Sequence, residues 1–266
     1  MLFPGSAAKV LAILEPMING PKIGTCGFGR VNRPEYFKLF PAVEVQHTFY
    51  QPPEIKTLEK WRAAAPDGFE FTLKAWQLIT HEATSPTYKR LKRFLSDDEA
   101  AETGFFKPTA MVREGLETTL ACARALQART ILFQCPAKFQ PLPENILNFK
   151  RFFSEIDRGG LNFAWEPRGK AWEDDLIKEL CDELDLWHCV DPFARATVTP
   201  ERPYYRMHGI PRWRYTYEDE ELFELVTLMP RDTLSYAFFN NITMKNDAVR
   251  FIDVVNSAAK GKKKGV

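Results

Sequence analysis

The chain has 266 residues, of which 45% are hydrophobic and 27% are charged, so it is long enough to bury a core without disulfides or metals. Its net charge of +1 offers no broad cationic surface for nucleic acid or for an acidic membrane. No segment approaches the ~20 apolar residues of a membrane span, and the start lacks the charged-then-apolar pattern of a secretory signal, which favours a cytoplasmic protein.

The first third of the chain alternates short strands with short helices. Residues 1–21 are expected to form an N-terminal appendage with a short helix at 8–14. After the first strand, Gly24, Gly27 and Gly29 do not have the spacing of a dinucleotide-binding loop. The pattern predicts a short first strand that runs into a glycine-rich loop within 22–29, and strands at 42–47 and 69–74. It also predicts helices at 34–39 and 54–65, and a rigid loop at 48–53.

A polar segment at 82–107 separates the third strand from a long helix at 109–127. It is long for a connection inside a compact domain, which indicates an insertion or a lid. In the helix, Met111, Leu116 and Leu120 fall at helical spacing. The rest of the pattern predicts strands at 130–135, 161–166, 187–191, 203–208 and 235–240, and helices at 143–154, 174–184, 219–228 and 247–259.

Eight predicted strands alternate with helices along 22–259, and no linker interrupts them. This order predicts a parallel sheet, and the number of strands favours closure into a single (β/α)8 TIM-like barrel with an insertion between the third and fourth strands. A doubly wound open sheet with a subdomain is the alternative. The basic residues at 260–266 are expected to form a flexible tail.

Most of the predicted strands end on a charged or amide residue. In a barrel, chemistry is located at the carboxyl ends of the strands, so these side chains would gather at one mouth. Because strand side chains alternate, Glu44 would share a face with Gln46, as would Arg206 with His208. The strand-end residues are Gln46, His47, Lys74, Gln134, Glu166, Asp191, Arg206, His208 and Asn240.

Short motifs lie along the same strands and their exits. They are Ile-Gly-Thr-Cys-Gly-Phe at Ile23, Val-Glu-Val-Gln-His-Thr-Phe-Tyr at Val43, Phe-Thr-Leu-Lys-Ala at Phe71, Ile-Thr-His at Ile79, Leu-Phe-Gln-Cys-Pro at Leu132, Trp-Glu-Pro-Arg at Trp165, Tyr-Arg-Met-His-Gly at Tyr205 and Phe-Phe-Asn-Asn at Phe238. In this order they resemble the domain of unknown function 72 (DUF72) family, which implies a TIM-like barrel but no assigned reaction. Gln46 and His47 stand where that family usually has asparagine and serine, and Phe28 where it usually has tryptophan.

The leading hypothesis is that the protein binds a small anionic or polyhydroxylated ligand at the barrel mouth. If the protein is an enzyme, this ligand is its substrate. Lys74 and Arg206 would hold an anionic group, and Glu166 or Glu44 would transfer a proton. Tyr50, Trp76 or Trp172 would cover the apolar face of the ligand. The catalytic candidates are Glu166, Glu44, Lys74 and Asp191, and the ligand-binding candidates are Arg206, His208, Arg168, Gln46, His47, Tyr50, Gln134, Asn240 and Asn241.

Three alternatives remain open from the sequence. Glu166 and Arg206 could instead form a structural ion pair that closes the barrel. A metal-dependent hydrolase of phosphoesters would use Glu44, Glu166, Asp191 and His208 as ligands. A module for single-stranded or damaged nucleic acid would use the arginines and aromatics Tyr204, Tyr205, Arg212, Trp213, Arg214, Tyr215 and Tyr217.

No motif indicates an organic cofactor, since the sequence contains no P-loop and no G-x-S-x-G elbow. The cysteines are odd in number and scattered, without C-x-x-C or zinc spacing, and are expected to be buried free thiols. We therefore expect no cofactor and no metal. The sequence makes no prediction about the oligomeric state.

Overall fold

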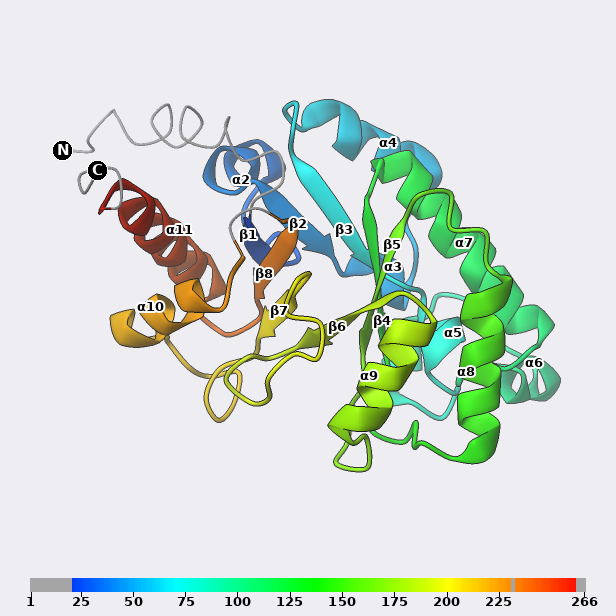
Figure 1. Ribbon diagram of the computed structural model, residues 1–266. Coiled ribbons are helices and arrows are strands. Elements are labelled where there is room, and N and C mark those ends of the chain that lie inside the picture. Colours follow the sequence, from blue (N-terminus) through cyan, green and yellow to red (C-terminus); the bar gives the residue numbers. More distant parts are fainter. Residues whose placement is uncertain (1–20, 231–232, 262–266) are drawn as a thin grey trace. The chain divides into compact units, whose positions relative to one another are not determined.

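The computed structural model describes residues 21–230 and 233–261 (Figure 1). Its strands are parallel and close into a barrel in the order β1-β2-β3-β4-β5-β6-β7-β8. The predicted (β/α)8 barrel is confirmed, and the doubly wound alternative is wrong. The helix predicted at 8–14 and most of the tail at 260–266 lie outside the described residues.

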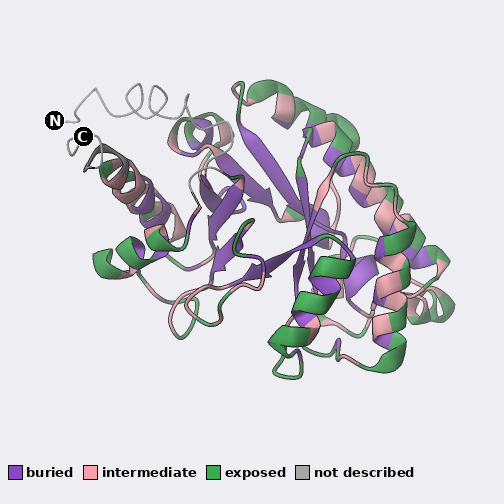
Figure 2. Cartoon of the chain, viewed as in Figure 1, coloured by how far each residue is buried: buried purple, intermediate pink, exposed green. Residues whose placement is uncertain are grey.

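Each strand is short and almost entirely buried (Figure 2). The strands are β1 (Pro21–Cys26), β2 (Ala42–Val45), β3 (Glu70–Lys74), β4 (Thr130–Gln134), β5 (Asn162–Glu166), β6 (Leu186–Val190), β7 (Tyr204–Met207) and β8 (Ser235–Phe239). The helices are α2 (Arg33–Leu39), α3 (His47–Tyr50), α4 (Ile55–Ala64), α5 (Gln77–Thr80), the 3-10 helix η1 (Pro86–Arg90), α6 (Asp97–Ala101), α7 (Ala110–Leu126), α8 (Pro143–Glu155), α9 (Asp174–Glu183), α10 (Asp219–Thr227) and α11 (Met244–Gly261).

Two predicted elements differ from the structure. The loop expected at 48–53 begins as the helix α3, because Gln46 already has helical dihedral angles (φ −91, ψ −22). The Thr48 side chain fixes this turn by donating to the carbonyl oxygens of Val45 at 3.1 Å and Lys74 at 2.7 Å. The last helix starts at Met244, earlier than predicted, because the Met244 amide already donates to the carbonyl of Asn241 at 3.2 Å.

The insertion predicted between the third and fourth strands is present and contains η1 and α6. Ser96 and Glu99 form a reciprocal capping box at the start of α6. Arg93 pairs with Glu99 at 3.0 Å and with Glu114 of α7 at 2.7 Å. The partly buried side chains of Tyr88, Leu91 and Leu95 pack on a cluster formed by Trp76, Leu78 and Met111. The insertion is therefore tied to α7, and its role as a lid stays a prediction.

The described residues fall into two compact units. The first contains those of Met1–Glu44, Ala64–Glu70 and Val190–Val266, and the second contains Val45–Ala63 and Phe71–Cys189.

In the second unit, α8 covers one face of β4 and β5 (Figure 1). Phe149 of α8 lies 4.5 Å from the Trp165 ring, and Phe153 lies 5.0 Å from the Phe133 ring. Because strand side chains alternate, Gln134 and Glu166, each next in sequence to one of these aromatics, point to the opposite face of the sheet.

In the first unit, β1 pairs with β2 and β8. Gly24 lies opposite Ala42, and a Cβ atom at this position would come within 2.1 Å of the Ala42 carbonyl oxygen. Glycine is thus required by close strand approach. Phe239 of β8 packs on Phe251 of α11 at 5.8 Å, which turns the neighbouring Phe238 toward the opposite face.

Candidate functional site

Three polar side chains occupy the carboxyl ends of adjacent strands in the second unit. Lys74 ends β3, Gln134 ends β4 and Glu166 ends β5. The strand register pairs Gln134 with Glu166 and Lys74 with Leu132, so all three share one face of the sheet. Lys74 and Glu166 are each only 5% exposed. Buried polar groups at strand ends are costly unless other polar groups or charges surround them.

The Lys74 ammonium lies 3.4 Å from the centre of the Phe49 ring. Phe49 reaches this position because α3 turns back immediately after β2, and Thr48 hydrogen-bonds the Lys74 carbonyl at 2.7 Å. A desolvated cation–π contact is worth about 2 kcal/mol, which offsets part of the cost of burying the ammonium. The short helix α3, which the sequence pattern missed, therefore helps to build the environment of Lys74.

Glu166 is oriented by Arg168, two residues further along the chain. The Arg168 guanidinium donates from Nε at 2.9 Å and from Nη2 at 2.8 Å, both to Oε1 of Glu166. The other carboxylate oxygen, Oε2, lies 3.8 Å from the Cys189 thiol. Cys135 donates its backbone amide to the Glu166 carbonyl at 3.0 Å, and burial raises the pKa of its own thiol. The thiol beside this site is therefore neutral.

His81 belongs to the same group, although the sequence did not predict it as a site residue. Its ring packs against Phe49 at 4.9 Å, and its Nδ1 lies 2.8 Å from Thr80 Oγ1. Burial, together with the charges of Lys74 and Arg168, lowers the pKa of His81 to about 3. The ring is thus neutral at physiological pH. Strand alternation could not find it because it follows α5, but it stands in the Ile-Thr-His motif.

The first unit contains a separate buried ion pair. Arg206 Nη2 lies 3.1 Å from Glu44 Oε1, with the two side chains 2% and 0% exposed. Tyr204 donates its hydroxyl to Oε2 of Glu44 at 2.7 Å. Burial, followed by the charge of Glu44, raises the pKa of the neighbouring Cys26 thiol. The carboxylate of Glu44 is therefore held by protein groups on both oxygens, and its predicted catalytic role stays a prediction.

Asp191 and His208 are adjacent in the first unit. Asp191 accepts hydrogen bonds from the backbone amides of His208 at 2.8 Å and of Phe193 at 3.1 Å. The His208 ring nitrogen Nδ1 lies 3.5 Å from the same carboxylate. Asp191 thus fixes the backbone where the chain leaves β6 and β7.

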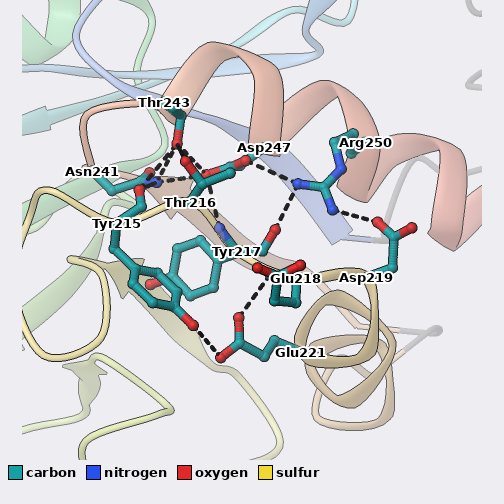
Figure 3. A network of polar contacts seen from close by, with 10 residues as sticks. All are labelled: Tyr215, Thr216, Tyr217, Glu218, Asp219, Glu221, Asn241, Thr243, Asp247 and Arg250. Atoms are coloured by element: carbon teal, nitrogen blue, oxygen red, sulfur yellow. Dashed lines mark hydrogen bonds and ion pairs between the residues drawn. The ribbon is translucent and has the colours of Figure 1, made fainter.

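Asn241 anchors the segment that follows β7 (Figure 3). Its side-chain amide donates to the Tyr215 carbonyl at 2.7 Å and to Asp247 at 2.6 Å. Arg250 reaches the same segment by donating to the Tyr217 carbonyl at 2.6 Å. The Asn241 amide hydrogens are consequently engaged within the fold, whereas the sequence predicted that they orient a ligand.

The aromatic run that suggested nucleic-acid binding is mostly packed into the first unit. Tyr217 is buried, and Tyr215 donates its hydroxyl to Glu221 at 2.6 Å (Figure 3). Tyr204 and Tyr205 are also buried. Trp213 is 53% exposed, and Arg214 lies 5.2 Å from its ring centre. Trp213 therefore keeps a large exposed surface in this run.

The remaining predicted ligand residues lie at the ends of strands or beyond them. Gln46 caps α3 and is half-buried, and Asn240 follows β8 and is half-buried. His47 is exposed, with its ring 5.8 Å from Trp61. Tyr50 is half-buried under the guanidinium of Arg90, 3.5 Å from its ring centre.

Two tryptophans expected to cover a ligand are core residues. Trp172 is buried, stacks on Phe139 at 5.5 Å and donates its indole N–H to the Phe139 carbonyl at 2.8 Å. Trp76 is buried with Leu78 and Met111. Their role in covering a ligand stays a prediction, because the sequence pattern does not distinguish an aromatic that lines a site from one that packs beneath it.

Within residues 21–230 and 233–261, no three histidine, cysteine, aspartate or glutamate side chains are grouped so that they could hold a metal ion. The ligand set that the sequence suggested for a metal-dependent hydrolase is therefore not assembled there. Among the same described residues, no helix is both long enough and apolar enough to cross a membrane.

Residues 30–265 match the family described as "Protein of unknown function DUF72". A DUF72 family protein from Enterococcus faecalis V583 is 19% identical and superposes with a TM-score of 0.66 over 89% of this chain and 95% of that chain. One from Thermotoga maritima is 20% identical, with a TM-score of 0.63 over 91% and 99%. Endonuclease IV from Thermus thermophilus is 12% identical, with a TM-score of 0.52 over 91% and 100%.

No protein of curated function matches the chain. At these identities the solved structures show a common barrel fold and carry no activity over to this chain. The family match, in contrast, spans most of the sequence and agrees with the motifs along the strands. The chain belongs to the DUF72 family.

Proposed function

We propose that this protein binds a small anionic or polyhydroxylated molecule at the carboxyl ends of β3, β4 and β5. The observation that carries the proposal is the burial of Lys74, Gln134 and Glu166 together on one face of three adjacent strands. Strand ends of a barrel are where ligand sites are built, and a purely structural role would be filled at lower cost by apolar residues.

Five side chains have complementary roles in this proposal. The Lys74 ammonium binds the anionic group, and the Gln134 amide donates to a hydroxyl and accepts from one. Glu166 accepts a proton while Arg168 keeps its carboxylate in one orientation. A neutral His81 can donate or accept a hydrogen bond without adding charge. If the ligand is a substrate, the reaction class is proton transfer at a carbon or oxygen beside the anionic group.

A thermal-shift screen tests the proposal with the full chain and a panel of hydroxy acids, sugar acids and polyols, none of which contains a phosphate group. We expect some members to raise the unfolding temperature of the wild-type protein, because a ligand that binds only the folded state stabilises it. The substitutions Lys74→Met and Glu166→Gln should each abolish or strongly reduce the shift of every hit.

Exposed residues of the same unit give matched controls. Lys170→Met and Glu144→Gln make the same chemical changes at exposed positions and should leave each shift unchanged. A hit whose shift survives both Lys74→Met and Glu166→Gln binds elsewhere. If every hit behaves in this way, the strand-end assignment is wrong.

A further inference from the structure

The second unit also contains a cavity of about 460 Å³ whose lining shares no residue with the strand-end group. On one side it is lined by α3 and the segment that follows it, and on the other by the end of η1 and the residues just beyond it. Its lining residues are His47, Tyr50, Gln51, Pro52, Pro53, Glu54, Arg90 and Lys92. The volume lies within the range of about 300–1,000 Å³ that is typical of small-molecule sites.

The charge of this cavity is predominantly positive. Arg90 and Lys92 contribute two cations, and Glu54 is the single acid of the lining. Neither Arg90 nor Lys92 pairs with a carboxylate in the described part of the chain, so both charges are available to a ligand. With two cations and one acid in its lining, the cavity carries a net positive charge, which attracts an anion.

Contacts around the cavity position the side chain of Arg90 and the backbone of Lys92, and both residues are exposed. The Arg90 guanidinium lies 3.5 Å from the centre of the Tyr50 ring. Gln51 accepts the backbone amide of Lys92 through its side-chain Oε1 at 3.0 Å, which joins the two sides of the cavity. Gln77 donates its side-chain amide to the backbone carbonyl of Tyr50 at 2.8 Å and so fixes the main chain at that residue. The order of both cationic segments therefore does not depend on a ligand.

We propose that this cavity binds a phosphate monoester. A phosphate monoester carries a charge of about −1.5 to −2 near neutral pH. Two cations balance this charge more closely than they would balance the single charge of a carboxylate. The planar donor fork of Arg90 suits two phosphate oxygens, and Lys92 supplies a point charge. Tyr50, Pro52 and Pro53 form an apolar wall, and the volume exceeds that of a lone phosphate, so the organic part of the ester lies against this wall.

The site is separate from the strand-end group and shares only the helix α3 with it. Phe49 of α3 packs on Lys74, whereas Tyr50 of the same helix lines the cavity. This arrangement makes the two sites separable by mutation, since Arg90 and Lys92 do not contact the strand ends in any described interaction.

Calorimetric titration of the full chain with phenyl phosphate, at constant ionic strength set with sodium chloride, tests the proposal. We expect saturable binding that is tighter than that of inorganic phosphate. Arg90→Ala and Lys92→Ala should each weaken it by about tenfold, the usual effect of losing one charge-assisted hydrogen bond. Arg90→Lys should bind between wild type and Arg90→Ala, because it keeps the charge and loses the fork.

Lys89→Ala is the matched control, because Lys89 is an exposed lysine of the same 3-10 helix and does not line the cavity. Its affinity should equal that of the wild type. The proposal is overturned by the absence of saturable binding, by a Lys89→Ala effect equal to that of Lys92→Ala, or by loss of binding in Lys74→Met with none in Arg90→Ala.

Discussion

Glu44 and Arg206 form an ion pair inside the barrel, where other protein groups also hydrogen-bond the carboxylate. The pair is almost completely buried, and Tyr204 takes the second carboxylate oxygen. Such a pair adds little to stability compared with apolar residues of the same size, but removing one partner takes away the opposite charge that lies against the other buried charge. The free energy of unfolding should therefore respond strongly to a single substitution and weakly to a double one.

We expect Glu44→Gln to lower the free energy of unfolding by about 3–5 kcal/mol, because Arg206 would stay buried without its carboxylate. Urea denaturation of the purified variant measures this loss. The double variant Glu44→Leu, Arg206→Met should be more stable than Glu44→Gln.

The control is Glu35→Gln, which removes an exposed carboxylate 3.8 Å from Lys245 and should cost less than about 1 kcal/mol. Equal losses for Glu44→Gln and Glu35→Gln would contradict the assignment of a buried structural pair.

The lowered pKa of His81 makes the stability of the protein depend on pH. Its pKa is lowered to about 3 by burial and by the neighbouring cations, so the folded state holds it neutral. The unfolded chain binds a proton at this residue near pH 6.5. The stability that the neutral ring provides is therefore complete above pH 6.5 and is lost as the pH falls toward 3.

In a histidine NMR titration, we expect the His81 ring signal to stay constant from pH 8 to about pH 4, with its assignment made from His81→Gln. The same substitution should flatten the fall of stability between pH 6.5 and the onset of acid unfolding. A His81 midpoint near 6.5 in the folded protein would show that the ring is not buried beside Lys74 and Arg168.

At the scale of elements, α7 lies close to α5 because one residue of its buried face has no side chain. A Cβ atom on Gly115 would lie 2.9 Å from Ile79 Cγ1 and 3.2 Å from Leu78 Cβ. Hydrophobic spacing predicted this helix correctly but favoured Leu116 and Leu120, which are only half-buried. The buried face instead contains Gly115 and Thr119, and the latter receives the Trp76 amide at 3.1 Å.

Gly115→Val should reduce the free energy of unfolding by about 1–3 kcal/mol, because the added methyl groups would force Ile79 and α5 apart. Glu117→Val is the control at an exposed position of the same helix, where only the lower helix propensity of valine acts, about 0.7 kcal/mol or less. Chemical denaturation compares the two. A smaller loss for Gly115→Val than for Glu117→Val would mean that the helices are not in contact at Gly115.

The short helix α3 shows why element boundaries were harder to predict than elements. The sequence continues from β2 with alternating residues, and the prediction followed this alternation through His47. The chain leaves the strand at Gln46 because the Thr48 hydroxyl donates a hydrogen bond to the carbonyl of Lys74, a residue that is distant in the sequence. Local patterns contain no information about such a partner, so the environment of Lys74 could not be predicted from the sequence.

At the scale of the whole molecule, the alternation of strands and helices was enough to predict the closed barrel. Parallel strands are buried on both faces, so each one consists of a short run of apolar residues. Such runs are easy to recognise in the sequence. The candidate site was predicted only in part. Lys74, Gln134 and Glu166 were found because they end strands, whereas His81 was missed because it follows a helical turn.

The cysteines provide a test of burial across both units. All five are free and buried. Burial raises the pKa of Cys122 to about 11, and it also raises the pKa values of Cys26 and Cys135. At pH 8 we expect no reaction of the native protein with an aromatic disulfide reagent, and reaction of all five thiols in guanidinium chloride. Rapid labelling of any of these cysteines in the native state would contradict their burial.

One titration tests whether a ligand binds at the ends of β3, β4 and β5. The strongest hit of the thermal-shift screen is titrated calorimetrically into wild-type protein, Lys74→Met and Arg90→Ala. We expect Lys74→Met to weaken binding by about tenfold or more, since a charge-assisted contact is lost, and Arg90→Ala to leave it unchanged. Equal affinity of the wild type and Lys74→Met would contradict the proposed site.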